Sequence, residues 1–247
     1  MKREVAFKAL VGSANYNLAT QESDKDYKVF VVPTFADLYN ATVYTESKVG
    51  DKLDEEFHDI RKLVNLLWKS NVNFLEVLFS TEITISENRS IAECIFQILA
   101  MKSEIATMNL PYLYKACKGM FDSKSKYVEA GNKGTHYLVE QYGFDTKSAM
   151  HAFRILDFIE RFSENDFTDF KGAMQYDSKG REFMLNMKGG EYTRNQYNDL
   201  LNAKLTTFNK LQVRYMEQPK NETIKKTLDE LIFKMIEKKI FLESNYL

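Results

Sequence analysis

The chain has 247 residues, of which 44% are hydrophobic and 28% are charged, and its formal net charge is −1. This composition is sufficient for a buried core, and the length allows one large domain or two small ones. The near-neutral charge excludes an overall basic field for nucleic acid, so binding of that kind would depend on a local patch. No run of about 18 apolar residues occurs, which excludes a membrane-spanning segment.

The N-terminal part of the chain has the patterns of β-strands. Apolar residues alternate from Val5 to Val11, which predicts a first strand that ends at Gly12-Ser13. Residues 27–32 form a β-rich apolar run and predict a buried second strand. Residues 43–57 are mixed in character and predict a further strand or a hairpin. The chain is therefore expected to open with an α/β part.

From His58 onward the apolar spacing changes to that of helices, and a helix is predicted to begin about there. The segment FLEVLFS, residues 74–80, predicts the next helix. Most of the chain beyond Glu82 is expected to be helical, with Pro111 and Pro219 at helix boundaries. The later amphipathic helices are predicted over residues 91–101, 111–125, 147–162 and 221–242. The predicted fold class is α+β, with a sheet in front and helices behind.

Two aspartates stand close together just before the second predicted strand. Residues two apart on a strand face the same side, so Asp24 and Asp26 are expected to point together, with Lys28 further along. Neighbouring carboxylates repel each other at low dielectric, and a hard divalent cation such as Mg²⁺ removes that conflict. Ser-Asp-Lys-Asp is also an ordinary turn composition, so a solvated turn stays an alternative. A calcium loop is not favoured, because Lys28 stands where a third acidic residue would be needed.

A Gly-Ser pair precedes these aspartates by about ten residues. Gly12 would let a phosphate approach the backbone, and the hydroxyl of Ser13 could hold its oxygens. A tight turn that requires glycine is the alternative. A Gly-Ser pair followed by a D-x-D pair, placed between two predicted strands, favours a combined phosphate and metal site.

The stretch GSANYNLATQESDKDYKVFVVP, residues 12–33, resembles the signature of the nucleotidyltransferases of the DNA polymerase β superfamily. That signature consists of a strand, Gly-Ser, a variable loop, S-D-x-D and an apolar strand. Asn17 stands where the most similar branch usually has glycine. This departure lies in the loop and leaves the acidic residues unchanged.

Two further blocks are similar to one branch of that superfamily, the predicted nucleotidyltransferases that include the RNA repair pathway polymerase β-like proteins. DEEFHDIRKLVNLLWKSNVNFLEVLFS, residues 54–80, resembles its acidic residue, helix and N-P-N-x-L-E-x-L-F-S segment, with Val72 in place of the proline. YGFDTKSAMHAFRILDFIE, residues 142–160, resembles its helical-domain motif. The resemblance covers most of residues 5–160.

The resemblance implies a small nucleotidyltransferase domain, similar to the polymerase β palm, over residues 1–105. Residues 106–247 would form a helical domain that completes the nucleotide and acceptor cleft. Asp24 and Asp26 would hold two Mg²⁺ ions, for which Mn²⁺ could substitute, together with a third carboxylate from a later strand. Asp54 is favoured as this third catalytic and metal-binding residue. Glu56 stays an alternative, because it would share a face with Asp54 if the segment is extended. A segment without a metal role is a further alternative, because LDEEFHD is acidic throughout and helices accept acidic residues near their N-termini.

The resemblance also implies a set of nucleotide contacts, namely Gly12, Ser13, Ser23, Lys147, His151 and Arg154. The last three would lie on one face of a helix and form a basic stripe, and the alternative is a solvated helix face. Lys133 and His136 are weaker candidates for the same contacts. Glu76, with Asn71 and Asn73, is expected to brace a loop between helices rather than touch substrate.

The implied function is Mg²⁺-dependent transfer of a nucleoside monophosphate from an NTP, with ATP favoured, to an acceptor hydroxyl, with release of pyrophosphate. The acceptor could be an RNA or tRNA end, a small molecule or a protein side chain. The alternative is a catalytically silent nucleotide-binding regulator or antitoxin-like protein on the same scaffold. An unrelated helical interaction protein with an α/β cap is a third reading. The oligomeric state is left open.

Cys94 and Cys117 are the only cysteines of the chain. Two cysteines do not make a disulfide scaffold, and these two lack the paired spacing of a zinc site. The opening MKREVAFKALVGS has no long apolar stretch, so no signal peptide is expected. A reducing, cytoplasmic location without a membrane partner is therefore predicted.

Overall fold

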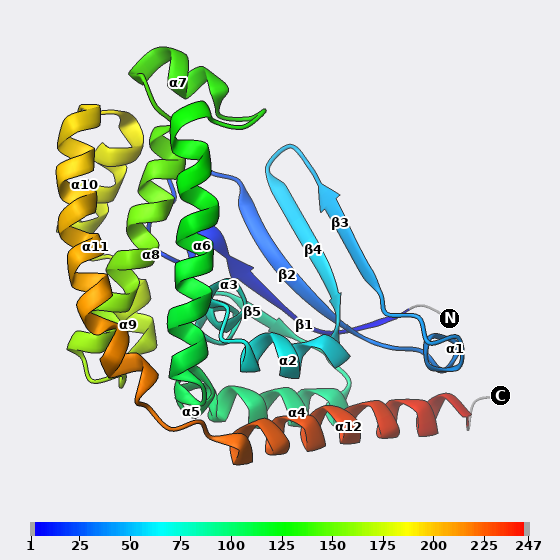
Figure 1. Ribbon diagram of the computed structural model, residues 1–247. Coiled ribbons are helices and arrows are strands. Elements are labelled where there is room, and N and C mark those ends of the chain that lie inside the picture. The colour runs from blue at the N-terminus through cyan, green and yellow to red at the C-terminus, as the bar shows by residue number, and fades with distance from the viewer. Residues whose placement is uncertain (1–2, 245–247) are drawn as a thin grey trace. The chain divides into compact units, whose positions relative to one another are not determined.

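The computed structural model describes residues 3–244 and confirms the predicted α+β class. The described residues form one mixed sheet of five strands in the order β3-β4-β2-β1-β5 (Figure 1). β2 pairs with β4 in parallel, and every other neighbouring pair in this sheet is antiparallel. The strands are β1 (Glu4–Val11), β2 (Lys25–Val32), β3 (Thr45–Val49), β4 (Leu53–Asp59) and β5 (Ile83–Ile85).

The register of these strands decides which side chains share a face of the sheet. Asp26 of β2 lies beside Asp54 of β4 in the parallel ladder. Four residues further along β2, and therefore on the same face, Phe30 stacks on Phe7 with 4.7 Å between the ring centroids. His58 of β4 packs against the other side of this pair, 5.5 Å from Phe30. An aromatic core therefore fixes the strand end at which the two aspartates lie.

The described chain divides into two compact units. The sheet unit comprises Met1–Asn109 and Pro219–Leu247, and the helical unit comprises Leu110–Gln218. The sheet unit carries the 3-10 turns η1 (Gly12–Ala14), η2 (Ile60–Lys62) and η3 (Glu76–Phe79) and the helices α1 (Phe35–Tyr39), α2 (Leu63–Trp68), α3 (Val72–Leu75), α4 (Arg89–Ala100), α5 (Lys102–Thr107) and α12 (Glu222–Ser244). The helical unit carries α6 (Leu110–Ala130), α7 (His136–Tyr142), α8 (Thr146–Glu164), α9 (Phe170–Met174), α10 (Ser178–Gly189) and α11 (Arg194–Met216).

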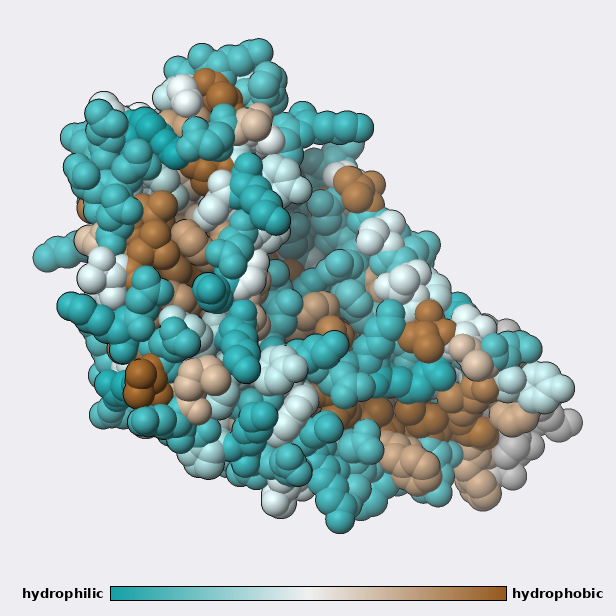
Figure 2. Space-filling model, viewed as in Figure 1, coloured by the Kyte–Doolittle hydropathy of each residue, from teal (hydrophilic) through white to brown (hydrophobic). Residues whose placement is uncertain are grey.

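The last helix returns to the sheet unit. α12 packs along α4 (Figure 1), and Leu228 and Met235 on its apolar face are buried. The N–H of Asn221 donates to the carbonyl of Met108 at 2.8 Å. An apolar groove of about 690 Å³ runs between α1 and α12, and Figure 2 shows the apolar strip on this face. None of the described helices has the length and apolar character needed to cross a membrane.

α8 is the centre of the helical unit, and α6, α9, α10 and α11 pack against it. Tyr197 and Tyr215 of α11 are fully buried against α8. Their hydroxyls donate to the carbonyls of Ala149 and Ile159, at 3.3 Å and 2.7 Å. Burial raises the pKa of Tyr197 to about 12, so its phenol stays protonated and remains a hydrogen-bond donor.

Most predicted elements are confirmed, and two are wrong. The first two strands, the hairpin β3–β4 and the helices α4, α6, α8 and α12 lie where the patterns predict them. FLEVLFS is not one helix, because α3 ends at Leu75 and the chain continues as the 3-10 turn η3. Ile83–Ile85 was expected in a helical region but forms β5, which pairs with β1.

The compact units differ from the predicted division at residues 105 and 106. Pro219–Leu247 belongs with the N-terminal part of the chain rather than with the helical part. The reason is hydrophobic: α12 buries its apolar face on α4, α2 and α5.

Candidate functional site

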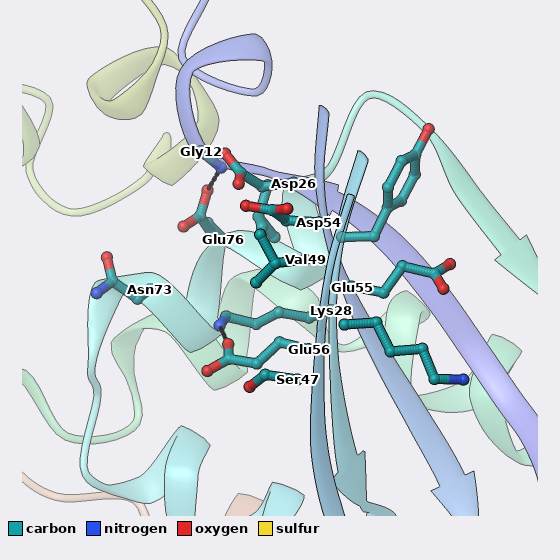
Figure 3. A pocket seen from close by; sticks show the side chains of 13 residues that line it. Gly12, Asp26, Lys28, Ser47, Val49, Asp54, Glu55, Glu56, Asn73 and Glu76 are labelled. Carbon is teal, nitrogen blue, oxygen red and sulfur yellow. Dashed lines mark hydrogen bonds and ion pairs between the residues drawn. The ribbon is translucent and has the colours of Figure 1, made fainter. Parts of the chain in front are cut away.

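An open cavity of about 340 Å³ lies where β2, β3 and β4 meet the turn η1 (Figure 3). It is formed entirely within the sheet unit. Its lining residues are Val11, Gly12, Asp26, Tyr27, Lys28, Ser47, Lys48, Val49, Asp54, Glu55, Glu56, Asn73 and Glu76. Among these lining residues five are acidic and two are basic, so the cavity carries an excess of negative charge at neutral pH.

Asp26 and Asp54 form the centre of this cavity. They are direct neighbours in the parallel ladder of β2 and β4, and their carboxylates lie close together beside Gly12 (Figure 3). Asp54 is oriented by the β3–β4 turn, because its Oδ1 accepts the Gly50 N–H at 3.2 Å. Glu55, between the two acidic positions of β4, points to the other side of the strands. Strand alternation therefore turns Glu55 away, and the ladder register places Asp54 rather than Glu56 beside Asp26.

Gly12 is required at its position for two independent reasons. Its φ is +70°, a conformation that side chains of L-residues rarely adopt. A Cβ built on Gly12 would lie 2.5 Å from Oδ2 of Asp26. The absence of a side chain therefore lets the backbone of the Gly-Ser turn approach the carboxylate directly.

Glu76 holds this turn from the opposite side of the cavity. Its carboxylate is almost completely buried, with 3% of the residue exposed, and its Oε2 accepts the Gly12 N–H at 3.1 Å. The same Oε2 lies 3.3 Å from the side-chain amide nitrogen of Asn15, which donates to it. Asn15 is fully buried and its Oδ1 accepts the Thr81 N–H at 3.1 Å. Glu76 therefore connects the turn η1 to the segment that follows α3.

Glu76 was predicted to brace a loop, and its place at the cavity was not predicted. The sequence does contain a signal for a buried role of Glu76. It lies between Leu75 and Val77, which are both fully buried, and a buried carboxylate needs a hydrogen-bond partner. Its partners Gly12 and Asn15 lie more than sixty residues earlier in the chain. A local pattern does not identify partners at that separation.

Replacing Glu76 by alanine is expected to lower the free energy of unfolding by about 2 kcal/mol, because the Gly12 N–H and the Asn15 amide lose the carboxylate that accepts from both. The Glu76→Gln variant keeps an acceptor oxygen and should lose less than half as much. Urea unfolding followed by circular dichroism measures both. Equal losses in the two variants would contradict the hydrogen-bonding role and would indicate a role for the charge.

A second set of charges lies deeper along the same face. The ammonium of Lys28 is largely buried, forms an ion pair with Glu56 and lies 4.7 Å from the centroid of the Phe74 ring. His58 Nε2 lies 3.3 Å from the same carboxylate. His58 first and Lys28 second hold the pKa of Glu56 at about 2. Glu56 is therefore already paired with the Lys28 ammonium, a pairing that is not recorded for Asp54 among the residues that the structure describes.

The Glu56 pair predicts a pH dependence of stability. Its folded-state pKa lies below the ordinary value of 4.5, so its contribution is present above that pH and is lost as the pH falls toward 2. The carboxylate is nearly half exposed, so the contribution is expected to be about 1 kcal/mol. Glu56→Gln should be less stable than wild type at pH 6 and equal to it near pH 2. Chemical unfolding at both pH values measures this.

Glu87→Gln is the matched control, because Glu87 is an exposed acidic residue at the edge of the same unit. Glu87→Gln should change the free energy of unfolding by the same small amount at both pH values. A Glu56→Gln variant whose deficit persists at pH 2 would contradict the assignment of the low pKa to the ion pair.

Three of the predicted residues lie near the cavity without lining it. Asp24 is exposed, directly before β2. The Ser23 hydroxyl accepts the Thr20 N–H at 2.9 Å and so belongs to a turn. Ser13 is half-buried in η1, next to Gly12. Asp24 therefore does not line the cavity with Asp26, and its role as a metal ligand stays a prediction.

The departure at Asn17 has a conformational explanation. Its φ is +60°, the left-handed region in which glycine is the usual residue. Asparagine is among the few other residues that adopt this conformation readily. The loop can therefore keep the same backbone path with asparagine in place of glycine.

The remaining predicted residues lie in the helical unit. Lys147, His151 and Arg154 belong to α8, where Lys147 is exposed and the other two are half-buried. His136 begins α7, and Lys133 is exposed in the loop before it. The structure thus groups the carboxylates in one unit and the basic stripe in the other.

The donor set of the cavity suits a hard divalent cation that is completed by a substrate. Within residues 3–244, no group of three or more His, Cys, Asp or Glu side chains that could hold a metal ion is found. Asp26 and Asp54 supply two carboxylates side by side, and Mg²⁺ typically binds one or two carboxylates together with water and substrate phosphates. Gly12 leaves space beside them for a further group.

Comparison with known proteins identifies the family to which the chain belongs. A search among curated proteins found no match. The sequence pattern of the RNA repair pathway DNA polymerase beta family, RlaP, matches residues 2–238. This match confirms the resemblance predicted from the sequence, and it indicates nucleotidyltransferase activity in general terms. With its paired aspartates beside a Gly-Ser turn on a mixed sheet, the chain belongs to the RNA repair pathway DNA polymerase beta family.

Proposed function

We propose that the protein is a Mg²⁺-dependent nucleotidyltransferase that moves a nucleoside monophosphate from an NTP to an acceptor hydroxyl and releases pyrophosphate. The observation that carries this proposal is the placement of Asp26 and Asp54 as ladder neighbours beside Gly12. Membership of the family supports it. ATP is proposed as the favoured nucleotide and Mg²⁺ as the metal, for which Mn²⁺ would substitute.

Asp26 and Asp54 would hold the metal ions, and Asp24 is proposed as a further ligand on the sequence motif alone. When bound, such ions neutralise the triphosphate and lower the pKa of the acceptor hydroxyl. The two carboxylates also exclude anions from the cavity until a cation is present, because their charges add at short distance. Asp54 is also proposed to accept the proton that the hydroxyl loses.

The Gly-Ser turn would receive the phosphates. The Gly12 N–H already donates to Glu76, so its amide is committed to the protein. Gly12 therefore contributes space rather than a donor, and the hydroxyl of Ser13 is proposed to hold a phosphate oxygen. The Ser23 hydroxyl, which belongs to the turn before β2, would act indirectly by fixing the start of that strand.

An RNA end, such as that of a tRNA, is the acceptor that the family description favours. The near-neutral net charge requires that an RNA is bound through a local patch. A small molecule and a protein side chain are the other acceptors to be compared. A cytoplasmic location is also proposed, because Cys94 and Cys117 are both free thiols and are both buried.

The test is a pyrophosphate-release assay with Mg²⁺ and each of the four labelled NTPs. Short RNAs with a free 3′-hydroxyl, deacylated tRNA and small hydroxyl compounds serve as acceptors. We expect label to be transferred to one acceptor class, with one pyrophosphate released per transfer. Release without transfer to any acceptor would indicate NTP hydrolysis and would contradict the proposed reaction.

One observation favours a second candidate, a catalytically silent nucleotide-binding protein. Asp24 is exposed and does not line the cavity, so two of the three favoured ligands, Asp26 and Asp54, line it. Two carboxylates are sufficient to hold a metal–nucleotide complex. Calorimetry that shows NTP binding with Mg²⁺, in a protein that releases no pyrophosphate with any acceptor, would favour this candidate.

A further inference from the structure

The strand β3 forms an exposed edge of the sheet (Figure 1). It pairs with β4 on one side, and all of its residues, Thr45–Val49, are exposed to solvent. An edge strand offers unpaired backbone N–H and C=O groups to a strand of another chain unless a proline, a bulge or a covering element blocks it. β3 contains no proline, and its register with β4 is regular along its whole length. Its edge is therefore open to pairing.

The ladder with β4 decides which backbone groups of β3 face outward. The N–H of Asp59 in β4 donates to the carbonyl of Tyr44, the residue before β3, at 3.0 Å. Hydrogen-bonded and non-hydrogen-bonded pairs alternate in an antiparallel ladder, so the residues within β3 that bond to β4 are Glu46 and Lys48. The residues whose backbone groups point away from β4, and which a further strand would bond, are Thr45, Ser47 and Val49.

The side chains of β3 carry one charge of each sign, placed symmetrically about Ser47. We propose that β3 pairs in antiparallel fashion with β3 of a second copy of this chain, with Ser47 opposite the partner's Ser47. In that register Glu46 faces the partner's Lys48, and Lys48 faces the partner's Glu46. Both are non-hydrogen-bonded positions, at which opposite side chains approach most closely. The two-fold axis of the dimer therefore generates two cross-strand ion pairs.

The charges select this register over its neighbours. An outward-facing residue bonds to an outward-facing residue of the partner, so an antiparallel partner can shift only in steps of two residues. One such shift sets Glu46 against the partner's Glu46, and the opposite shift sets Lys48 against the partner's Lys48. Like charges directly opposite each other are destabilising. The register centred on Ser47 is therefore the one that the charges favour.

The two charges of β3 are available for a partner. Lys48 and Glu46 lie 3.6 Å apart along the strand, and their side chains are 56% and 41% exposed. An ion pair of that exposure contributes little to stability, so exchanging it for pairs with a partner costs little. Lys48 also lies 4.5 Å from the centroid of the Phe57 ring, and the hydroxyl of Tyr44 donates to Glu46. These two contacts orient the charged groups beside the strand before a partner arrives.

The pairing would also reach the cavity of Asp26 and Asp54, because Ser47 and Val49 line it. The two-fold axis of an antiparallel strand pair is perpendicular to the sheet, so both cavities would open on the same face of one continuous sheet. Val49 is 83% exposed, and the partner's Thr45 would cover part of it at the rim of the cavity. The pairing does not depend on the reaction proposed for the cavity, so either can fail without the other.

The test is sedimentation velocity of the full chain from about 10 μM to about 1 mM, without nucleotide or metal. Wild type should form a reversible dimer. Ser47→Pro should abolish the dimer, because it removes an outward N–H and leaves the bonds to β4 in place, as edge strands allow. Ser47→Ala keeps that N–H and should dimerise as wild type does. A wild type that stays monomeric throughout, or a dimer that persists unchanged in Ser47→Pro, would overturn the inference.

A charge exchange tests the register. Lys48→Glu and Glu46→Lys should each weaken the dimer about tenfold, because each sets like charges against each other. An equimolar mixture of these two variants should associate as strongly as wild type, since every cross-strand pair then has opposite charges. Lys226→Glu reverses an exposed charge on α12 and should change association less than about twofold. A mixture no stronger than its components, or equal weakening by Lys226→Glu, would overturn the inference. Circular dichroism confirms that each variant is folded.

Discussion

Replacing Asp26 by asparagine is expected to lower nucleotidyl transfer by about a thousandfold. The asparagine side chain would keep the size and one oxygen of the carboxylate but lose the charge that Asp26 contributes beside Asp54. A divalent cation at this position would lose one of its two carboxylates. The assay is the rate of pyrophosphate release at saturating NTP and Mg²⁺, compared with that of wild type.

The same substitution should leave the fold intact. Without metal, Asp26→Asn removes a repulsion between neighbouring carboxylates, so its melting temperature should equal or exceed that of wild type. Wild type should be stabilised by Mg²⁺ or Mn²⁺, and the variant should not. Asp51→Asn, which removes an exposed aspartate from the turn between β3 and β4, is the matched control and should behave as wild type. Full activity of Asp26→Asn would refute the catalytic assignment.

Replacing Gly12 by alanine should impair both stability and turnover. The left-handed backbone at φ +70° costs an alanine about 1–2 kcal/mol. The new methyl group would meet Oδ2 of Asp26 at 2.5 Å, so the carboxylate or the turn must move. A displacement of about 1 Å at a reacting centre lowers turnover by about a hundredfold. Urea unfolding and the pyrophosphate assay measure the two effects.

Gly119 provides the matched control for this substitution. It lies inside α6, and a Cβ there would meet no atom within 4 Å. Gly119→Ala should therefore stabilise the protein by about 0.5–1 kcal/mol, since alanine is the better helix former. Gly12→Ala with unchanged turnover would show that the Gly-Ser turn does not set the position of Asp26.

The sequence patterns predicted those elements whose hydrophobic period extends over several turns or strand residues. β1, α8 and α12 have such a period, whereas β2 was predicted from a continuous apolar run, and Tyr27–Val32 are buried on both faces. FLEVLFS was misassigned because seven residues that are almost all buried show no period at all. β5 has three residues, and its pairing with β1 comes from tertiary contact rather than from local preference.

Site residues that belong to one short sequence motif could be predicted. Site residues whose hydrogen-bond or ion-pair partners lie far away in the sequence were harder to predict. Gly12 and Asp26 follow from one stretch of sequence, and the structure brings them together. The acidic run of β4 did not separate Asp54 from Glu56, whereas strand register and the Lys28 ion pair do. Glu76 was missed as a cavity residue because its partners are far away in the chain. The predicted roles of all these residues in catalysis stay predictions.

The return of α12 to the sheet unit has a consequence for biosynthesis. The helical unit is one continuous segment, so all of its contacts are available once that segment has left the ribosome. The sheet unit is interrupted by it, and the apolar surface of α4 has no cover until α12 emerges. The two units are therefore completed in the reverse of their order along the chain. Premature termination before Pro219 would leave a folded helical unit attached to an aggregation-prone sheet.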